Sequence, residues 1–374
     1  MVVQGLSSMV EVVKAPPEDR VRLDASLVSV PDLRIDYGRH PAYAPFSGVA
    51  GIGRRLHALG TFVRLFALTT IKRLIDYELI PTHVRDNRSL AGRLRFMSCT
   101  VSNAFLKVLG RPSAVGLPAS EAIAARLDRD GIAVVAIEPA LFARLETDAV
   151  PFFERLRVRR GKVEGSREFD ESRSTARRDE AERLFSTIEE ILLTSGALGA
   201  ISRHIGRRAS LVDVNPQIND ASDDFWRRIF PDLPPADRPV KYMHRDASGG
   251  DIKAIFYLSD VSADNGPFSY CLGSHRVRSR GLRDWVEEAN DMGILSGTSR
   301  EARELFAVLP RWLQTKCSFG NDLLPTHPAV GSILKSEWTI TAPKGHVVLF
   351  DTKGLHRGGM VDQGERKVIT CVTG

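Results

Sequence analysis

The chain has 374 residues, of which 43% are hydrophobic and 26% are charged, and these are ordinary values for a globular protein. This composition excludes a disordered chain, a collagen-like repeat and a disulfide-rich miniprotein, while the length allows two or three domains, or one large domain with an appendage. Residues 1–117 hold 16 Lys and Arg against 9 Asp and Glu, and the remainder holds 36 against 37, so the net charge of +6 originates in the N-terminal third.

The N-terminal third combines an irregular arm with predicted helices. Residues 1–50 show no sustained apolar period, whereas from Arg54 to about Leu109 apolar residues recur at helical spacing, which predicts two or three helices. Charged residues interrupt the apolar stretch from Leu56 to Ile80, so no window of about 20 residues is apolar enough to cross a bilayer. A helix packed on the core is favoured here over a helix that lies at a membrane surface.

The basic excess and the N-terminus suggest where the protein works. An ordinary solvated, arginine-rich surface is the favoured explanation of the charge. The alternative is an acidic partner, such as a phosphate-bearing carrier or an anionic membrane surface, and no nucleic-acid partner is expected. The N-terminus carries charge before any long apolar run, so we expect no signal peptide and a cytoplasmic protein. The four cysteines are far apart and are expected to be reduced thiols.

The segment from Pro112 to Pro118 is predicted to join two domains, and the pattern of predicted elements changes after it. A helix ending at Gly131 and a β-branched strand from Ile132 to Ile137 begin a second domain, so residues 1–117 and 118–374 are the predicted domains. Apolar residues at helical spacing then predict a helix that ends at Gly196. From Ser210 onward, short β-rich runs alternate with Gly, Pro, Asn and Asp turns, which favours an antiparallel sandwich or barrel. The runs are 252–258, 337–340, 347–350 and 368–372. The insertion at about 276–328 is partly helical and is predicted to be a lid.

Three residues that can ligate a metal lie at positions from which their side chains could reach one ion. His244 and Asp246 are two residues apart, so on a strand both side chains project from one face. His356, just past the predicted strand 347–350, is the candidate third ligand. Two histidines and one carboxylate leave positions open on an octahedral ion, as in non-haem Fe(II) oxygenases, whereas a structural zinc site is closed. Arg366, ten residues after His356, is suited to form a bidentate pair with the carboxylate of a cosubstrate.

These residues belong to longer motifs that resemble a known family. The motifs are HRD at 244–246, IFYLSDVSADNGPFSYCLGSHR at 255–276 and GHVVLFDTKGLHRGGMVDQGERKVI at 345–369. They include Asn265-Gly266-Pro267 and Gly273-Ser274-His275, and in this order they resemble the phytanoyl-CoA dioxygenase (PhyH-like) family of Fe(II)/2-oxoglutarate-dependent oxygenases. The resemblance covers residues 120–374.

The resemblance implies a fold and an activity. The fold is mainly β with flanking helices, built on a double-stranded β-helix (jelly roll, cupin-like) core, and a helical N-terminal extension precedes it. His244, Asp246 and His356 would be the catalytic residues that hold Fe(II), and Arg366 would bind 2-oxoglutarate. The enzyme would use dioxygen to hydroxylate an unactivated C–H bond of a small-molecule or acyl-type (acyl-thioester) metabolite, releasing succinate and CO₂. Halogenating relatives replace the carboxylate ligand with a small residue, so Asp246 favours hydroxylation.

Two other functions stay open, as do the roles of several residues near these motifs. The chain is alternatively a non-catalytic jelly-roll binding protein, or a cupin-like metal isomerase that does not use 2-oxoglutarate and needs no carboxylate clamp. His275 and His346 are expected to be structural. Trp285 and Trp312, in the predicted lid, are candidate substrate contacts. Lys253 is either a second cosubstrate contact or a solvent-facing lysine.

Overall fold

The computed structural model describes most of the chain. The described residues are 15–23, 33–48, 50–86, 88–110, 117–161, 173–221, 243–246, 252–277, 281–294, 300–317 and 322–374. The predicted joint falls mostly outside them, because residues 111–116 are not described.

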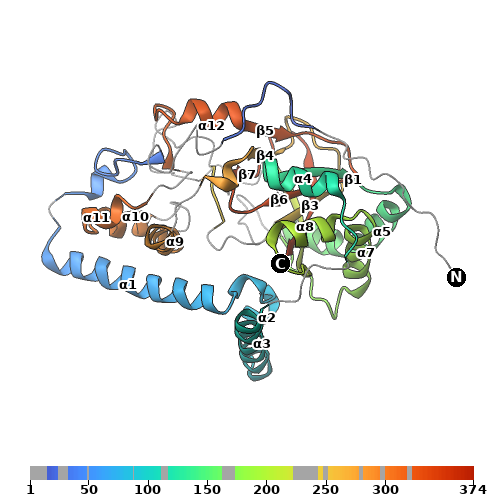
Figure 1. Cartoon of the computed structure of the whole chain (residues 1–374), viewed down its shortest axis with the longest axis horizontal. Helices are drawn as coiled ribbons and strands as arrows, with labels where there is room; N and C mark the ends of the chain where they lie inside the picture. The colour runs from blue at the N-terminus through green and yellow to red at the C-terminus, as the bar shows by residue number, and fades with distance from the viewer. Residues whose placement is uncertain are drawn as a thin grey trace.

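Two antiparallel sheets form the centre of the molecule (Figure 1). The first has the strand order β1-β6-β3-β8-β2 and the second the order β5-β4-β7. The bounds in the first sheet are β1 Ile132–Ala136, β6 His346–Asp351, β3 Ile252–Tyr257, β8 Glu365–Thr373 and β2 Leu211–Asp220. Those in the second are β5 Glu337–Ile340, β4 Phe268–Cys271 and β7 His356–Arg357. The four strands predicted after residue 250 are therefore confirmed to within a few residues.

The two faces of the five-stranded sheet are buried against different partners. One face packs on the second sheet through an inner cluster that includes Val348, Phe350 and Val368 from the first sheet and Phe268 and Ile340 from the second. The other face, with alternating residues of the same strands, packs under four helices. These helices are α4 Glu121–Asp130, α5 Pro139–Arg160, α7 Glu182–Thr194 and α8 Ala197–Ile205.

Local sequence explains where α4 ends and β1 begins. The Ser120 hydroxyl caps the helix by accepting a hydrogen bond from the Ile123 N–H. Gly131 ends it in the left-handed region at φ 78°, and a Cβ atom there would lie 2.4 Å from the Tyr270 hydroxyl. The predicted helix end at Gly131 is confirmed, and both backbone conformation and space require glycine at this position.

The N-terminal extension packs onto the insertion. The extension contains η2 Ala44–Phe46, α1 Ile52–Leu74, η3 Tyr77–Leu79, α2 Thr82–Arg85 and α3 Leu90–Leu109. The later helices are η6 Ser274–Arg276, α9 Leu282–Ile294, α10 Arg300–Ala307, α11 Arg311–Gln314 and α12 Val330–Ser336. Residues of both regions share one hydrophobic cluster, and Arg73 of α1 pairs with Asp284 of α9 at 2.7 Å. The domain boundary at residue 117 stays a prediction.

Helices contribute more residues than strands do, so the expectation of a mainly β chain understates the helix content. The reason is that helices cover the outer face of the large sheet and also form the extension and the insertion. Within the described ranges, no single helix is long and apolar enough to span a membrane. The bent pair α7 and α8 passes that test jointly, on length and composition.

Candidate metal centre

His244 and His356 lie directly opposite each other on neighbouring extended segments. The two residues exchange both backbone hydrogen bonds, with N···O distances of 3.0 and 2.9 Å, and so extend the second sheet beyond β7. Opposite residues of an antiparallel pair project from the same face, and their ring centroids lie 4.5 Å apart. The Asp246 N–H donates to the Thr352 carbonyl at 3.1 Å, which holds the carboxylate residue beside them.

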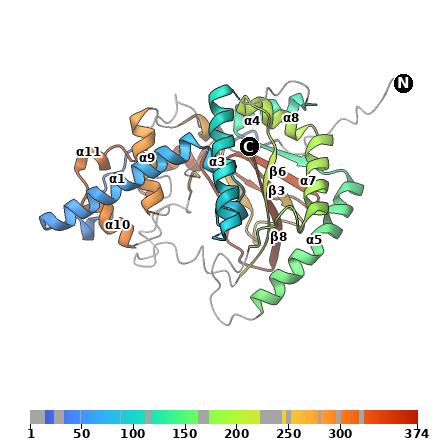
Figure 2. The ribbon, with the colours of Figure 1, turned by 90° about the horizontal axis from the view of Figure 1, so that it is seen from below.

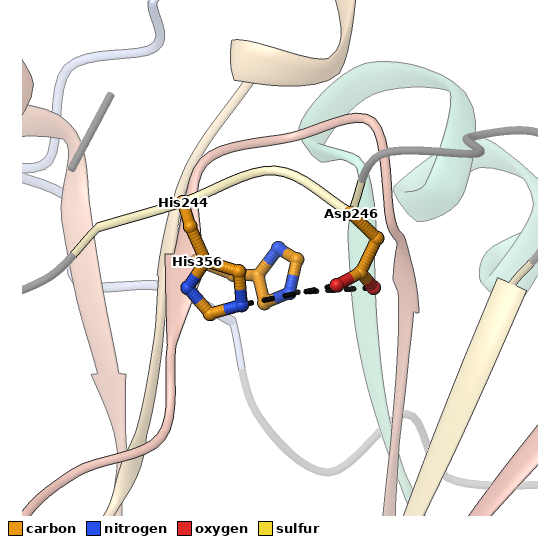
Figure 3. Close-up of side chains that lie close together, drawn as sticks. All are labelled: His244, Asp246 and His356. Atoms are coloured by element: carbon orange, nitrogen blue, oxygen red, sulfur yellow. Dashed lines mark ion pairs between the residues drawn. The ribbon is translucent and has the colours of Figure 1, made fainter. Parts of the chain in front are cut away.

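The three side chains point toward one another (Figure 3). Asp246 oxygens lie 3.8 Å from Nε2 of His244 and 3.6 Å from Nε2 of His356, and all three ligand atoms lie within 4.8 Å of one another. Nδ1 of His356 lies 2.8 Å from the Gly354 carbonyl oxygen. Because a carbonyl only accepts hydrogen bonds, Nδ1 carries the proton and Nε2 of the neutral ring keeps its lone pair for a metal. The group could hold a metal ion.

Aromatic packing fixes the orientation of the His356 ring. Its centroid lies 4.9 Å from that of Phe350, 5.8 Å from that of Phe268 and 6.5 Å from that of Tyr270, with which it is stacked. The Tyr270 hydroxyl donates to the Asp351 carbonyl at 3.0 Å. A ligand ring locked in this way needs little reorganisation to bind a metal ion.

Positive charge keeps the Asp246 carboxylate ionised. Burial acts to raise its pKa, but nearby positive charge, above all that of the Lys253 ammonium, outweighs burial and holds the pKa well below its usual value. The Lys253 ammonium donates to Oδ2 of Asp246 at 2.7 Å. Lys253 therefore contacts a member of the candidate centre while its side chain stays 30% exposed, and its role as a second cosubstrate contact stays a prediction.

Arg366 enters the same space between the sheets from the first residues of β8. It lies two residues before Val368 of the inner cluster, so the two share a face of the strand. The arginine is 7% exposed, and its Nη2 donates to Oδ1 of Asn219, the residue opposite it on β2, at 3.1 Å. Burial raises the pKa of the nearby Tyr257 to about 12, and the charge of Arg366 opposes that rise.

The Asn265-Gly266-Pro267 turn packs against the guanidinium of Arg366. Gly266 has φ +80°, and a Cβ atom there would lie 2.8 Å from the Gly359 carbonyl oxygen and 3.2 Å from Nη1 of Arg366. The Asn265 side chain holds the turn, accepting from the Ser262 N–H at 2.8 Å. This turn limits where the arginine side chain can lie.

The Gly273-Ser274-His275 motif positions the segment that carries His356. The Ser274 hydroxyl accepts from the Leu355 N–H at 2.7 Å, directly before that histidine. His275 lies outside the three-residue group and contacts the Asp128 carbonyl at 3.3 Å. Burial lowers the pKa of His275 to about 4, and the geometry agrees with the structural role expected for it.

No family model matches the chain. No curated protein matches it either. Solved structures similar to it include the carbocyclase SnoK, a non-heme alpha-ketoglutarate-dependent enzyme of nogalamycin biosynthesis, at 15% identity and TM-score 0.40, covering 71% of this chain and 86% of SnoK. EctD from S. alaskensis, with 2-oxoglutarate and 5-hydroxyectoine, has 13% identity and TM-score 0.42, covering 71% and 79%. The epimerase SnoN, with Fe³⁺, alpha-ketoglutarate and nogalamycin RO, has 15% identity and TM-score 0.39, covering 68% and 82%. Each likeness is distant.

Other residues that the sequence singled out lie elsewhere. Trp285 packs against Phe66 of α1, with ring centroids 6.1 Å apart, and Trp312 is 56% exposed on α11. Their role as substrate contacts stays a prediction. His346 begins β6, with Nδ1 2.9 Å from the Pro343 carbonyl oxygen. Sequence reasoning missed Asn219, because an isolated Asn on an unrecognised strand carries no motif.

Proposed function

We propose that the chain is an Fe(II)/2-oxoglutarate-dependent oxygenase of the PhyH-like family, built on a double-stranded β-helix. The observation that carries the proposal is the convergence of two histidines and one carboxylate on a space between two sheets that a buried arginine also borders. A jelly roll consists of two antiparallel sheets packed face to face, and the strand orders and the inner cluster agree with that architecture.

The donor set fits Fe(II). Two imidazoles and one carboxylate with open positions are the ligand set of non-haem Fe(II) oxygenases, whereas a structural zinc site needs a closed shell of four ligands. His244, Asp246 and His356 would hold the ion. In this role, the hydrogen bond from Nδ1 of His356 to Gly354 selects the tautomer that binds through Nε2.

The buried arginine fits the distal carboxylate of 2-oxoglutarate. The guanidinium is already oriented by Asn219 and confined by the Gly266 turn, so binding a carboxylate costs it little conformational entropy. A charge-assisted bidentate pair contributes about 1.5–3 kcal/mol. Lys253, beside Asp246, is placed to bind a second oxygen of the cosubstrate in exchange for its present contact with that carboxylate.

When bound, Fe(II) and 2-oxoglutarate supply the oxidising chemistry: 2-oxoglutarate is decarboxylated to succinate and CO₂, and dioxygen gives one oxygen atom to succinate and one to a substrate C–H bond. The protein contributes orientation of the ligands and an apolar wall that excludes water. That wall includes Phe268 and Phe350 beside His356. We propose hydroxylation of a small-molecule or acyl-type metabolite, since the carboxylate ligand Asp246 is present.

Succinate release without added substrate tests this function. The purified chain should form succinate from 2-oxoglutarate when Fe(II), air and ascorbate are present, with ascorbate as the reductant in place of a substrate, and His244→Ala should abolish both iron binding and succinate formation. His57→Ala is the matched control, because His57 is exposed on α1 and is not one of the three donors. Equal succinate formation by all three proteins would refute the assignment, and metal binding without any use of 2-oxoglutarate would favour the metal isomerase.

A further inference from the structure

Exposed apolar side chains concentrate on two helices of the N-terminal extension. Of the 21 large hydrophobic residues that are exposed in the described part of the chain, 14 lie on α1 and α3. On α3, Leu90 is 76% exposed, Val101 68% and Val108 85%. Monomeric proteins rarely expose a contiguous apolar patch of this kind unless something covers it.

On each helix these residues form one stripe, away from the packed side. The stripe of α3 runs through positions 90, 94, 97, 101, 105 and 108, which repeat every three or four residues. Gly92 is the only buried residue of α3. On α1, Ala58, Phe62 and Thr69 are buried, whereas residues 52, 56, 63, 71 and 74 are exposed. Each helix therefore has an outer apolar stripe that no described part of the chain covers.

The charge of these helices has one sign. Neither α1 nor α3 contains an Asp or Glu, and together they contain eight Lys and Arg. Some of the basic residues pair with other parts of the chain, as Arg73 does with Asp284. Arg55, Arg64, Arg93 and Arg95 are exposed and form no ion pair with any described residue. The apolar stripes are thus flanked by cationic side chains, which favours an anionic partner.

The two helices lie on the same side of the molecule and run in different directions. In Figure 2, the view from below, α3 lies in front of the sheets, whereas α1 lies in front of α9 and α10, and the two helices run in different directions. Figure 1 shows both at the lower edge of the molecule. A single partner helix lies along one helix, whereas a flat surface on this side of the molecule lies against both.

We propose that α1 and α3 form a docking face for a bilayer surface that contains anionic lipids. A bilayer offers an apolar layer for the two stripes and phosphates for the flanking arginines, which is the chemistry that interfacial amphipathic helices use. A second copy of the chain would bring the same four arginines, and so more charge of the same sign, to the interface. An acidic protein would match the charge and leave much of the apolar area uncovered.

Vesicle co-sedimentation of the full chain tests the proposal. The protein should bind vesicles of phosphatidylcholine and phosphatidylglycerol in equal parts, bind phosphatidylcholine vesicles weakly, and lose binding as salt is raised. The double variant Leu94→Glu/Val101→Glu on α3 should weaken binding more than tenfold. Val150→Glu/Val158→Glu is the matched control, because these valines are 47% and 59% exposed on α5, and it should bind as the wild type does.

Several results would overturn the proposal. One is a folded wild type that does not bind the anionic vesicles; another is binding that the α3 variant leaves unchanged. A dimer in light scattering that the α3 variant dissociates would assign the face to a second copy instead. Circular dichroism checks that each variant folds, and Leu56→Glu/Val63→Glu on α1 is the second variant should α3 unfold. Arg93→Gln/Arg95→Gln should weaken binding to the anionic vesicles alone.

Discussion

Replacing Gly266 by alanine tests how the turn before β4 supports the arginine. Gly266 has φ +80°, where an L residue costs about 1–2 kcal/mol, and its new Cβ would lie 2.8 Å from the Gly359 carbonyl oxygen. The same Cβ would lie 3.2 Å from Nη1 of Arg366. Overpacking of this kind typically costs about 1–3 kcal/mol. We therefore expect Gly266→Ala to lower the free energy of unfolding by about 2–5 kcal/mol.

Gly364 provides the matched control for this substitution. It also has positive φ, +74°, but a Cβ atom there would meet nothing within 4 Å. Gly364→Ala should therefore cost only the backbone part, about 1–2 kcal/mol. Urea unfolding measures both losses, and their difference isolates the steric effect at the turn.

The functional readout is the requirement for 2-oxoglutarate. Gly266→Ala displaces the guanidinium of Arg366 and should raise the 2-oxoglutarate concentration needed for succinate formation, whereas Gly364→Ala should leave it unchanged. If the two variants lose equal stability and need equal 2-oxoglutarate, the turn does not position the arginine and the reasoning is refuted.

Three further predictions concern the centre and its surroundings. Arg366→Ala should raise the 2-oxoglutarate requirement about 10- to 150-fold, the equivalent of 1.5–3 kcal/mol, with iron affinity unchanged; an equal loss of iron affinity would contradict this. Mn(II) at one hundred times its dissociation constant should stabilise the wild type by about 2.7 kcal/mol in thermal melts and leave Asp246→Ala unaffected, and equal stabilisation of both would exclude the site. The pKa of His204 is raised: burial acts to lower it, but the hydrogen bonds to Asp351 and Asp128 outweigh burial. The stability that His204 contributes is therefore present below about pH 6.5 and is lost as pH rises through its raised pKa. His204→Gln should lose less stability above about pH 6.5 than the wild type does. If the free energy of unfolding falls with pH equally in both proteins, the interaction is refuted.

The sequence predicted the strands of the second half well because their residues alternate between two environments. Val368 and Val372 face one way and Ile369 and Cys371 the other, between turns rich in Gly and Asp. Strand β2 was missed for the opposite reason. Its inner face carries Asn215, Gln217 and Asn219, and Pro216 interrupts it, so its alternation is hidden. Proline is tolerated there because β2 is the last strand in the order of its sheet.

For the candidate centre, spacing alone placed His244 and Asp246 on one side of an extended segment, and the structure brings His356 to them. The contact between Lys253 and Asp246 depends on how two segments of the chain pack together, so no local sequence pattern predicts it. On α1 the prediction of a core-packed helix holds for one side only. Periodicity shows that an apolar stripe exists, and it does not show whether Val63 and Leu74 are covered.

An anaerobic titration of the metal-free protein with Fe(II) and then with 2-oxoglutarate tests the central claim most directly. The account predicts one equivalent of Fe(II), followed by a visible metal-to-ligand charge-transfer band that saturates at one equivalent of 2-oxoglutarate and is lost in His356→Ala. Folded protein that binds Fe(II) at the three residues and shows no such band at any 2-oxoglutarate concentration would contradict it.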